Sequence, residues 1–264
     1  MESGRDTVRQ AIVLIGALLA VFGAFIGSGA AGGTPIQDAS GGALAADATT
    51  IAPGGPAFAI WTPIYLGLLV YAFWQSMPKQ RADERQRRLG YPIAASLILN
   101  AVWILSIQAG FLALSIPVIA VLLASLVWIF FVMIRTKAKN TFELIVVDGT
   151  MGLYLGWVCV ATAANVTALL VAAGFGGWGI PREVWSVVVL AIAAAIGVLL
   201  AVRSGGRLAP SASLAWGLIW IAIARLSGVL ESTSTGIAAI VAAIIVVVAT
   251  VALRVRRQFS HERD

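Results

Sequence analysis

The sequence predicts an all-α membrane protein, a polytopic bundle of about eight helices that span a lipid bilayer. Of its 264 residues, 60% are hydrophobic and 11% are charged, and the mean hydropathy is +0.95. An average soluble domain carries about 25% charged residues. Several runs of about 18 or more nearly uncharged residues have the length of a membrane-spanning helix. A soluble enzyme and a disordered chain are therefore excluded.

The apolar runs define the predicted elements in chain order. Because the bilayer offers peptide groups no water, each run is expected to form a helix. The fifth run would be about 40 Å long at 1.5 Å per residue, so it must tilt, kink or emerge from the bilayer. The predicted spans are residues 10–31, 58–76, 90–110, 112–134, 145–171, 184–202, 211–229 and 236–253.

The basic residues predict the orientation of these spans. Every lysine and arginine except Arg182 and Arg225 falls in the N-terminus, in an even-numbered connection or in the C-terminal tail. Cytoplasmic segments carry the excess of lysine and arginine, so both termini are expected in the cytoplasm, in the inner membrane of a bacterium. The net charge of +6 is then a topology signal, and nucleic-acid binding is not expected.

The N-terminal part leaves two alternatives open. Arg5 and Arg9, the apolar run and the small residues Gly29-Ala30-Ala31 resemble a signal peptide, although the run is long enough to be retained as a span. The first connection, residues 32–57, is rich in small residues and has no base. On the outer face it is either a cap over a cavity or a surface strap.

Single residues exclude several kinds of site. Cys159 is the only cysteine and His261 the only histidine, so an intrachain disulfide, a thiolate cluster, a histidine zinc site and a Ser-His-Asp triad are excluded. We therefore expect no metal site, no catalytic residue and no required cofactor.

Charged residues near the spans have plain interpretations. Glu143 and Asp148 are expected at a solvated cytoplasmic end, paired with Lys137 or Lys139. Arg225 lies within the seventh span, where a charge is costly. It is expected to snorkel or to pair with Glu231; turned inward, it would be the partner of an anionic ligand group.

Three spans carry aromatic and amide residues at helical spacing, so each set shares one helix face. Amides at membrane depth should face protein or a cavity, and indole rings suit a planar apolar ligand. Interface anchoring is the alternative for Trp74, Trp128, Trp178 and Trp185, which lie near span ends. The three sets are Phe58, Trp61 and Tyr65; Ser96, Asn100 and Trp103; and Tyr154, Trp157, Ala161 and Asn165.

These residues carry a resemblance to a known family. Residues 58–65, FAIWTPIY, resemble the F-x-x-W-x-x-x-Y start of the second helix in the TspO/MBR family, the translocator and tryptophan-rich sensory proteins. Residues 99–103, LNAVW, are similar to its L-N-x-x-W. Residues 154–165, YLGWVCVATAAN, resemble its Y-L-x-W-V-x-F-A-T-x-L-N. The motifs occur in the family's order, within about residues 8–175.

The resemblance implies a five-helix core at residues 1–175 and an extension of three helices at residues 176–264, with a basic cytoplasmic tail. It implies a membrane sensor or receptor that binds a porphyrin-like or sterol-like ligand beneath the first outer loop, and a homodimer by analogy. The implied ligand-binding residues are Phe58, Trp61, Tyr65, Asn100, Trp103, Tyr154, Trp157, Ala161 and Asn165.

Two other functions stay open at this point. A secondary transporter of a small hydrophobic solute would suit eight helices, with Asp148 as the one acid available for proton coupling. Light-dependent porphyrin breakdown, reported for some members of the family, is the only enzymatic chemistry that the residues support.

Overall fold

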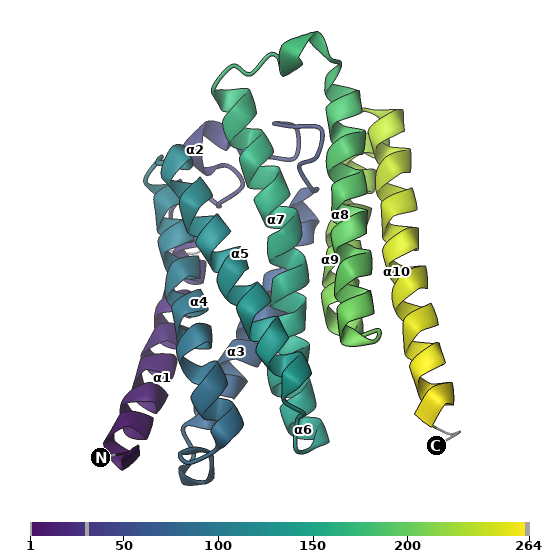
Figure 1. Ribbon diagram of the computed structural model, residues 1–264. Coiled ribbons are helices and arrows are strands. Elements are labelled where there is room, and N and C mark those ends of the chain that lie inside the picture. The colour runs from purple at the N-terminus through teal and green to yellow at the C-terminus, as the bar shows by residue number, and fades with distance from the viewer. Residues whose placement is uncertain (1, 30–31, 262–264) are drawn as a thin grey trace. The chain divides into compact units, whose positions relative to one another are not determined.

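The computed structural model describes residues 2–29 and 32–261, and these residues form helices and loops without a strand (Figure 1). Within them, eight helices are long and apolar enough to cross a membrane. The predicted all-α fold class is confirmed. The predicted end of the first span at Ala31, and the small residues Ala30 and Ala31 of the signal-peptide interpretation, lie outside the described residues.

The chain forms two compact units, each built from two segments. Met1–Gly41 and Trp61–Met151 form unit 1, and Gly42–Ile60 and Gly152–Asp264 form unit 2. The predicted domain boundary at residue 175 does not coincide with this division, and as a boundary between functions it stays a prediction.

Unit 1 is organised around α4. Its helix α1 packs along α4, and α5 packs on α4 as well. Small residues allow the close approach: a Cβ on Gly23 would lie 3.4 Å from Cα of Ala101, and one on Gly27 would lie 2.8 Å from Cγ2 of Ile104. The helices of unit 1 are α1 (Glu2–Gly27), α2 (Ala39–Gly42), α3 (Trp61–Gln75), η2 (Pro78–Gln80), α4 (Glu84–Gln108), α5 (Leu112–Arg135), α6 (Thr141–Glu143) and η3 (Leu144–Gly149).

Helix α4 begins six residues before the predicted span at Gly90 because its charged first turns are helical too. Asp83 is the N-cap, and its side chain accepts a hydrogen bond of 3.0 Å from the backbone N–H of Gln86. The same carboxylate pairs with Lys139. Burial acts to raise the pKa of Asp83, but the hydrogen bonds from Lys139 and Gln86 outweigh it and hold the pKa below its usual value.

We expect Asp83→Ala to lower the free energy of unfolding by about 1 kcal/mol, the usual cost of a lost N-cap. Because the folded-state pKa of Asp83 is lowered, its contribution is complete above the unfolded pKa of about 3.9 and disappears as pH falls through the folded value. Thermal unfolding in detergent between pH 2 and 6 measures this, with Lys139→Ala as a control that keeps the cap. An equal loss of stability in the two variants would contradict the capping role.

The fifth span departs from a regular α-helix, as its length predicts. After α6 the chain forms the π-helical segment Leu144–Gly149 and then continues as α7 (Thr150–Ala172). A π-helical turn widens the helix by one residue and occurs often at functional sites. Here it places Val146, Val147 and Asp148 in the interior.

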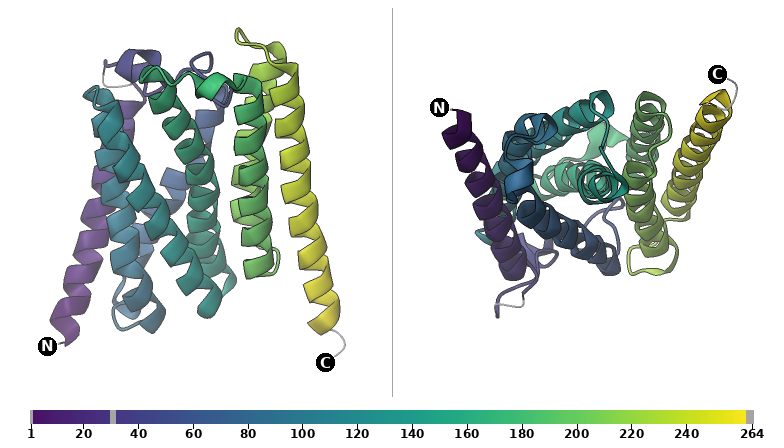
Figure 2. Two further views of the ribbon diagram at one scale, coloured as in Figure 1. Left: turned by 45° about the horizontal axis from the view of Figure 1, so that its top comes forward. Right: turned by 90° about the horizontal axis from the view of Figure 1, so that it is seen from below.

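Unit 2 contains most of α7 and three further long helices. Helices α8, α9 and α10 stand side by side in both views of Figure 2, and α9 contacts both of the others. Their shared core is rich in alanine, including Ala215, Ala222 and Ala242, which permits close packing. The remaining helices of unit 2 are η1 (Gly55–Ile60), η4 (Gly177–Gly179), α8 (Arg182–Ser204), α9 (Leu208–Ser227) and α10 (Thr233–His261).

Two glycines of α7 pack against α9. A Cβ on Gly152 would lie 2.9 Å from Cβ of Ala209, and one on Gly156 would overlap the carbonyl oxygen of Pro210. Large apolar side chains such as Phe73 and Ile192 are more than half exposed. An apolar exterior of this kind is what a lipid environment requires.

Candidate functional site

Three predicted ligand-binding residues come together in unit 1. The rings of Trp61 and Tyr65 on α3 are stacked, with centroids 5.1 Å apart and an interplanar angle of 20°. Asn100 on α4 is fully buried, and its Nδ2 donates a hydrogen bond of 2.7 Å to Oη of Tyr65. Trp103, one turn further along α4, is 4% exposed. The prediction that Asn100 faces protein is confirmed.

The remaining predicted residues belong to unit 2. Phe58 of η1 meets Trp157 of α7 edge to face, with ring centroids 5.7 Å apart. Tyr154 and Asn165 are fully buried, and Ala161 is half-buried. The predicted residues are thus divided between the two units, and their convergence on a common pocket stays a prediction.

Unit 2 itself holds a cavity of about 580 Å³, within the range of small-molecule sites. Its walls come from the first loop, the end of α7, the connection to α8 and the first turns of α8, and they are mainly apolar. None of the nine predicted ligand-binding residues lines it. The lining residues are Ala48, Thr49, Thr50, Ile51, Thr167, Leu170, Val171, Phe175, Gly176, Gly177, Trp178, Ile180, Arg182, Trp185, Ser186, Val189 and Leu230.

Three aromatic rings form one wall of this cavity. The rings of Phe175, Trp178 and Trp185 pack edge to face, with centroid separations of 5.2, 6.3 and 5.8 Å. Trp178 has a φ of 54°, between Gly177 and Gly179, which also have positive φ. A left-handed tryptophan is strained, and such strain gathers at functional sites. Anchoring at the membrane interface therefore does not fully account for Trp178 and Trp185, because both also line the cavity.

The first loop supplies the polar part of the cavity. Thr50 Oγ1 lies 2.5 Å from Oγ of Ser186, which joins the loop to α8. Thr49 is 4% exposed, and among the described residues its hydroxyl has no hydrogen-bond partner. Arg182 adds a cation whose side chain is 63% exposed and pairs with Glu183 at 3.0 Å. The loop therefore lines a cavity, as the cap interpretation expects.

Arg225 on α9 holds the first loop in place. The two roles expected for it, snorkelling and pairing with Glu231, are both wrong. It is 1% exposed, so it does not snorkel, and no ion pair joins it to Glu231 in the described part of the chain. Its Nη1 donates a hydrogen bond of 3.1 Å to the carbonyl of Thr49, and its Nη2 donates to the carbonyl of Ala46. A guanidinium can satisfy two loop carbonyls in this way because of its planar fork of donors.

Two further contacts from α9 hold the end of the loop. The backbone N–H of Gly54 donates to the carbonyl of Trp220 at 3.2 Å. Trp216 donates from Nε1 to the carbonyl of Ala57 at 2.9 Å. A Cβ on Gly54 would lie 3.3 Å from the ring of Trp220, so the glycine permits this approach.

A buried charge cluster lies in unit 1, where a solvated helix end was expected. Arg85 donates from Nη1 to Oε1 of Glu143 at 2.8 Å and from Nη2 to Oδ2 of Asp148 at 2.6 Å. The two carboxylates are 2% and 4% exposed. The expected ion pairs with Lys137 or Lys139 are wrong: Lys139 pairs with Asp83 and offers Glu143 only its backbone N–H.

Sequence reasoning missed the aromatic wall and the buried cluster for different reasons. Phe175, Trp178 and Trp185 lie within one short glycine-rich stretch, but tryptophans near span ends such as Trp178 and Trp185 also fit membrane-interface anchoring. The partner of Glu143 lies far away in sequence, at Arg85. Within residues 2–29 and 32–261, no group of three or more His, Cys, Asp and Glu residues is placed to hold a metal ion.

Comparison with known proteins identifies the family. A family model described as TSPO-like protein matches residues 12–252. No curated protein and no solved structure matches the chain. The match extends past residue 175, the limit that the motifs indicate, and includes α8, α9 and most of α10. With eight apolar helices in its described part and a family match over most of its length, the chain is an integral membrane protein that belongs to the TSPO-like family.

Proposed function

We propose that the protein is a membrane receptor or sensor that binds a planar apolar molecule, with a porphyrin-like tetrapyrrole or a sterol-like compound as the ligand class. The cavity of about 580 Å³ in unit 2 is the observation that carries this proposal. It combines an apolar interior with a few polar groups, which is the usual composition of a small-molecule site.

The residues around the cavity suit such a ligand. Stacking on Phe175, Trp178 and Trp185 and the removal of apolar surface from water supply affinity. The hydroxyl of Thr49 supplies one hydrogen bond that fixes orientation. Because Arg225 is engaged by loop carbonyls, we assign an anionic ligand group to Arg182, which lines the cavity and whose exposed ion pair with Glu183 contributes little.

Titration of the purified protein with protoporphyrin, followed by quenching of tryptophan fluorescence, tests this proposal. We expect saturable quenching and a dissociation constant about tenfold higher in Trp185→Leu, because an aromatic contact contributes about 1 kcal/mol or more beyond its area. Trp128→Leu is the matched control, since Trp128 is 62% exposed on α5 in unit 1. It should leave the dissociation constant unchanged.

Other outcomes of the same titration separate the alternatives. Weakening by Trp157→Phe but not by Trp185→Leu would place the ligand at the motif residues instead. Absence of saturable quenching would rule out porphyrin. Illumination of the complex tests the enzymatic alternative, which requires a bilin-like product spectrum.

The buried cluster favours a carrier as the second candidate. Arg85 pairs with two carboxylates, those of Glu143 and Asp148, and buried ionisable residues within membrane spans commonly mark transport pathways. Solute uptake into liposomes that is lost in Asp148→Asn would support proton-coupled transport. Uptake that continues in this variant would exclude it.

We infer from the basic connections that both termini lie in the cytoplasm of a bacterium. Arg85, Lys139 and Arg207 belong to the even-numbered connections of the predicted spans, which this rule assigns to the cytoplasm. The homodimer stays a prediction by analogy.

A further inference from the structure

We propose a second binding site, for the phosphate group of an anionic membrane lipid, between the first turns of α1 and α4 in unit 1. A small cavity of about 220 Å³ lies there, lined by Arg5, Asp6, Arg9, Arg87 and Tyr91. It belongs to a different unit from the cavity of the proposed function, and it stands independently of that proposal.

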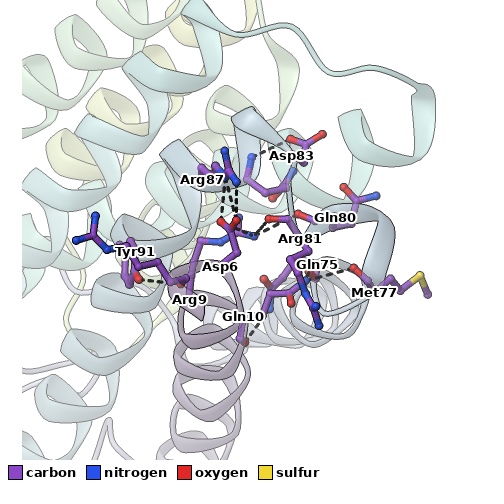
Figure 3. Close-up of polar contacts among 12 residues, drawn as sticks. Asp6, Arg9, Gln10, Gln75, Met77, Gln80, Arg81, Asp83, Arg87 and Tyr91 are labelled. Carbon is purple, nitrogen blue, oxygen red and sulfur yellow. Dashed lines mark hydrogen bonds and ion pairs between the residues drawn. The ribbon is translucent and has the colours of Figure 1, made fainter. Parts of the chain in front are cut away.

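The acid in this cavity is already neutralised. Arg87 donates to Asp6 from Nε at 3.0 and 3.2 Å and from Nη2 at 2.6 Å. Figure 3 shows this contact between the two helices, with Arg9 and Tyr91 beside it. A bidentate arginine–carboxylate pair is geometrically specific, so Asp6 is held by Arg87 and a formal charge of +2 remains from the two other arginines.

Arg9 carries one of these two charges, and it is the buried one. It is 1% exposed, and its Nη2 donates to the carbonyls of Gln80 and Arg81 at 3.2 and 3.0 Å, which are neutral acceptors. Its Nε and Nη1 have no hydrogen-bond partner among the described residues, and Asp6 is 4.0 Å away. Its counter-charge, Asp6, is shared with Arg87, which binds the carboxylate more closely, so the buried guanidinium of Arg9 is only partly compensated. An external anion in the adjacent cavity would stabilise it.

The rim of the cavity supplies accessible groups for that anion. Arg5 is exposed, and Tyr91 is 46% exposed with its hydroxyl 3.4 Å from the carbonyl of Arg5. The packing of α1 along α4, with close contacts at Gly16 and Gly23, holds the two sides of the cavity in place. The site is therefore preorganised by the helix pair rather than by a loop.

The position along the helices favours a lipid as the source of the phosphate. Arg5 and Arg9 lie in the first turns of the membrane-spanning part of α1, and Arg87 and Tyr91 lie in those of α4. This is the depth of lipid headgroups, where tyrosine is enriched and basic pockets bind anionic lipids. Exposed apolar residues of α1, such as Val8 and Ile15, continue from the cavity toward the bilayer interior and suit an acyl chain.

Native mass spectrometry of the full chain in detergent, with added phosphatidylglycerol, tests the site. We expect at least one tightly bound phosphatidylglycerol, and about fivefold weaker binding in Arg5→Gln, the usual effect of one basic residue near an anionic membrane. Arg5→Lys keeps the charge and should stay within about twofold of the parent. Neither change removes a packed side chain, because Arg5 is exposed.

Arg88→Gln is the matched control. It removes one positive charge from the same end of α4, but Arg88 pairs with Glu84 and does not line the cavity. Its phosphatidylglycerol affinity should equal that of the parent. An equal loss in Arg5→Gln and Arg88→Gln, or equal binding of phosphatidylglycerol and phosphatidylcholine, would overturn the proposal.

Inorganic phosphate distinguishes the two sources of the anion. If the source is lipid, millimolar phosphate should not displace phosphatidylglycerol and should not raise the melting temperature of the lipid-free protein. A phosphate-induced rise that Arg5→Gln abolishes and Arg88→Gln preserves, without retention of phosphatidylglycerol, would assign the site to soluble phosphate and overturn the lipid assignment.

Discussion

Arg85→Leu should lower the free energy of unfolding by about 3–5 kcal/mol, the cost of removing one partner from a buried ionic group. The substitution leaves the carboxylates of Glu143 and Asp148 buried without their shared cation. Gln86 Nε2 still donates to Glu143 at 3.0 Å, but a neutral amide cannot replace the charge. Denaturation in mixed detergent micelles measures the change.

Two further variants test whether the lost stability comes from the buried cluster of Arg85, Glu143 and Asp148. Asp148→Asn should be milder than Arg85→Leu, because Arg85 keeps Glu143 as its counter-charge. Lys139→Ala should cost about 0.3 kcal/mol, since the Lys139 side chain is 64% exposed and such pairs contribute little. Comparable losses for Arg85→Leu and Lys139→Ala would show that the buried cluster is not a principal source of stability.

Arg225→Met should release the first loop and remove ligand binding in unit 2. Hydrogen bonds to a charged group contribute about 1.5–3 kcal/mol each, so the loss of those to Thr49 and Ala46 should cost at least about 2 kcal/mol. Because Thr49 lines the cavity, the loosened loop should also raise the dissociation constant for protoporphyrin by tenfold or more. Hydrogen exchange should become faster in residues 46–52.

The control for this prediction is Arg203→Met. Arg203 lies in the last turn of α8, at the opposite end of that helix from Ser186, which contacts the loop. Its stability and its exchange rates in residues 46–52 should match those of the parent protein. Unchanged exchange in Arg225→Met would mean that the contacts from Trp216 and Gly54 hold the loop without the arginine.

The spans were predictable because each one depends on the summed hydropathy of consecutive residues and on no contact with a distant segment. Hydropathy over about 20 residues identifies a helix in lipid, and the eight predicted runs correspond to the eight described spans. The helix ends were less accurate, because a helix continues into charged turns that hydropathy excludes. For α4 a local signal existed: Asp83 followed by Gln86 has the spacing of a capping box.

The partners of single polar residues were not predictable, because they depend on contacts between distant segments. Arg225 and Thr49 are 176 residues apart in sequence. The π-helical segment Leu144–Gly149, which directs Asp148 inward, has no sequence pattern that distinguishes it from an α-helix. The motif residues could be named from their spacing, which shows that they share a helix face. The spacing does not show which cavity that face lines.

The first loop belongs to a different unit from the two segments that flank it in sequence, and this affects the order of folding during synthesis. Residues 42–60 leave the ribosome with the segments of unit 1, yet they belong to unit 2 and are anchored by Arg225, Trp216 and Trp220. These anchors are made more than 150 residues later. Until α9 has been made, the nascent loop has the contact of Thr50 with Ser186 on α8 but none of these anchors, so a chain that stops before residue 208 should hold the loop less firmly.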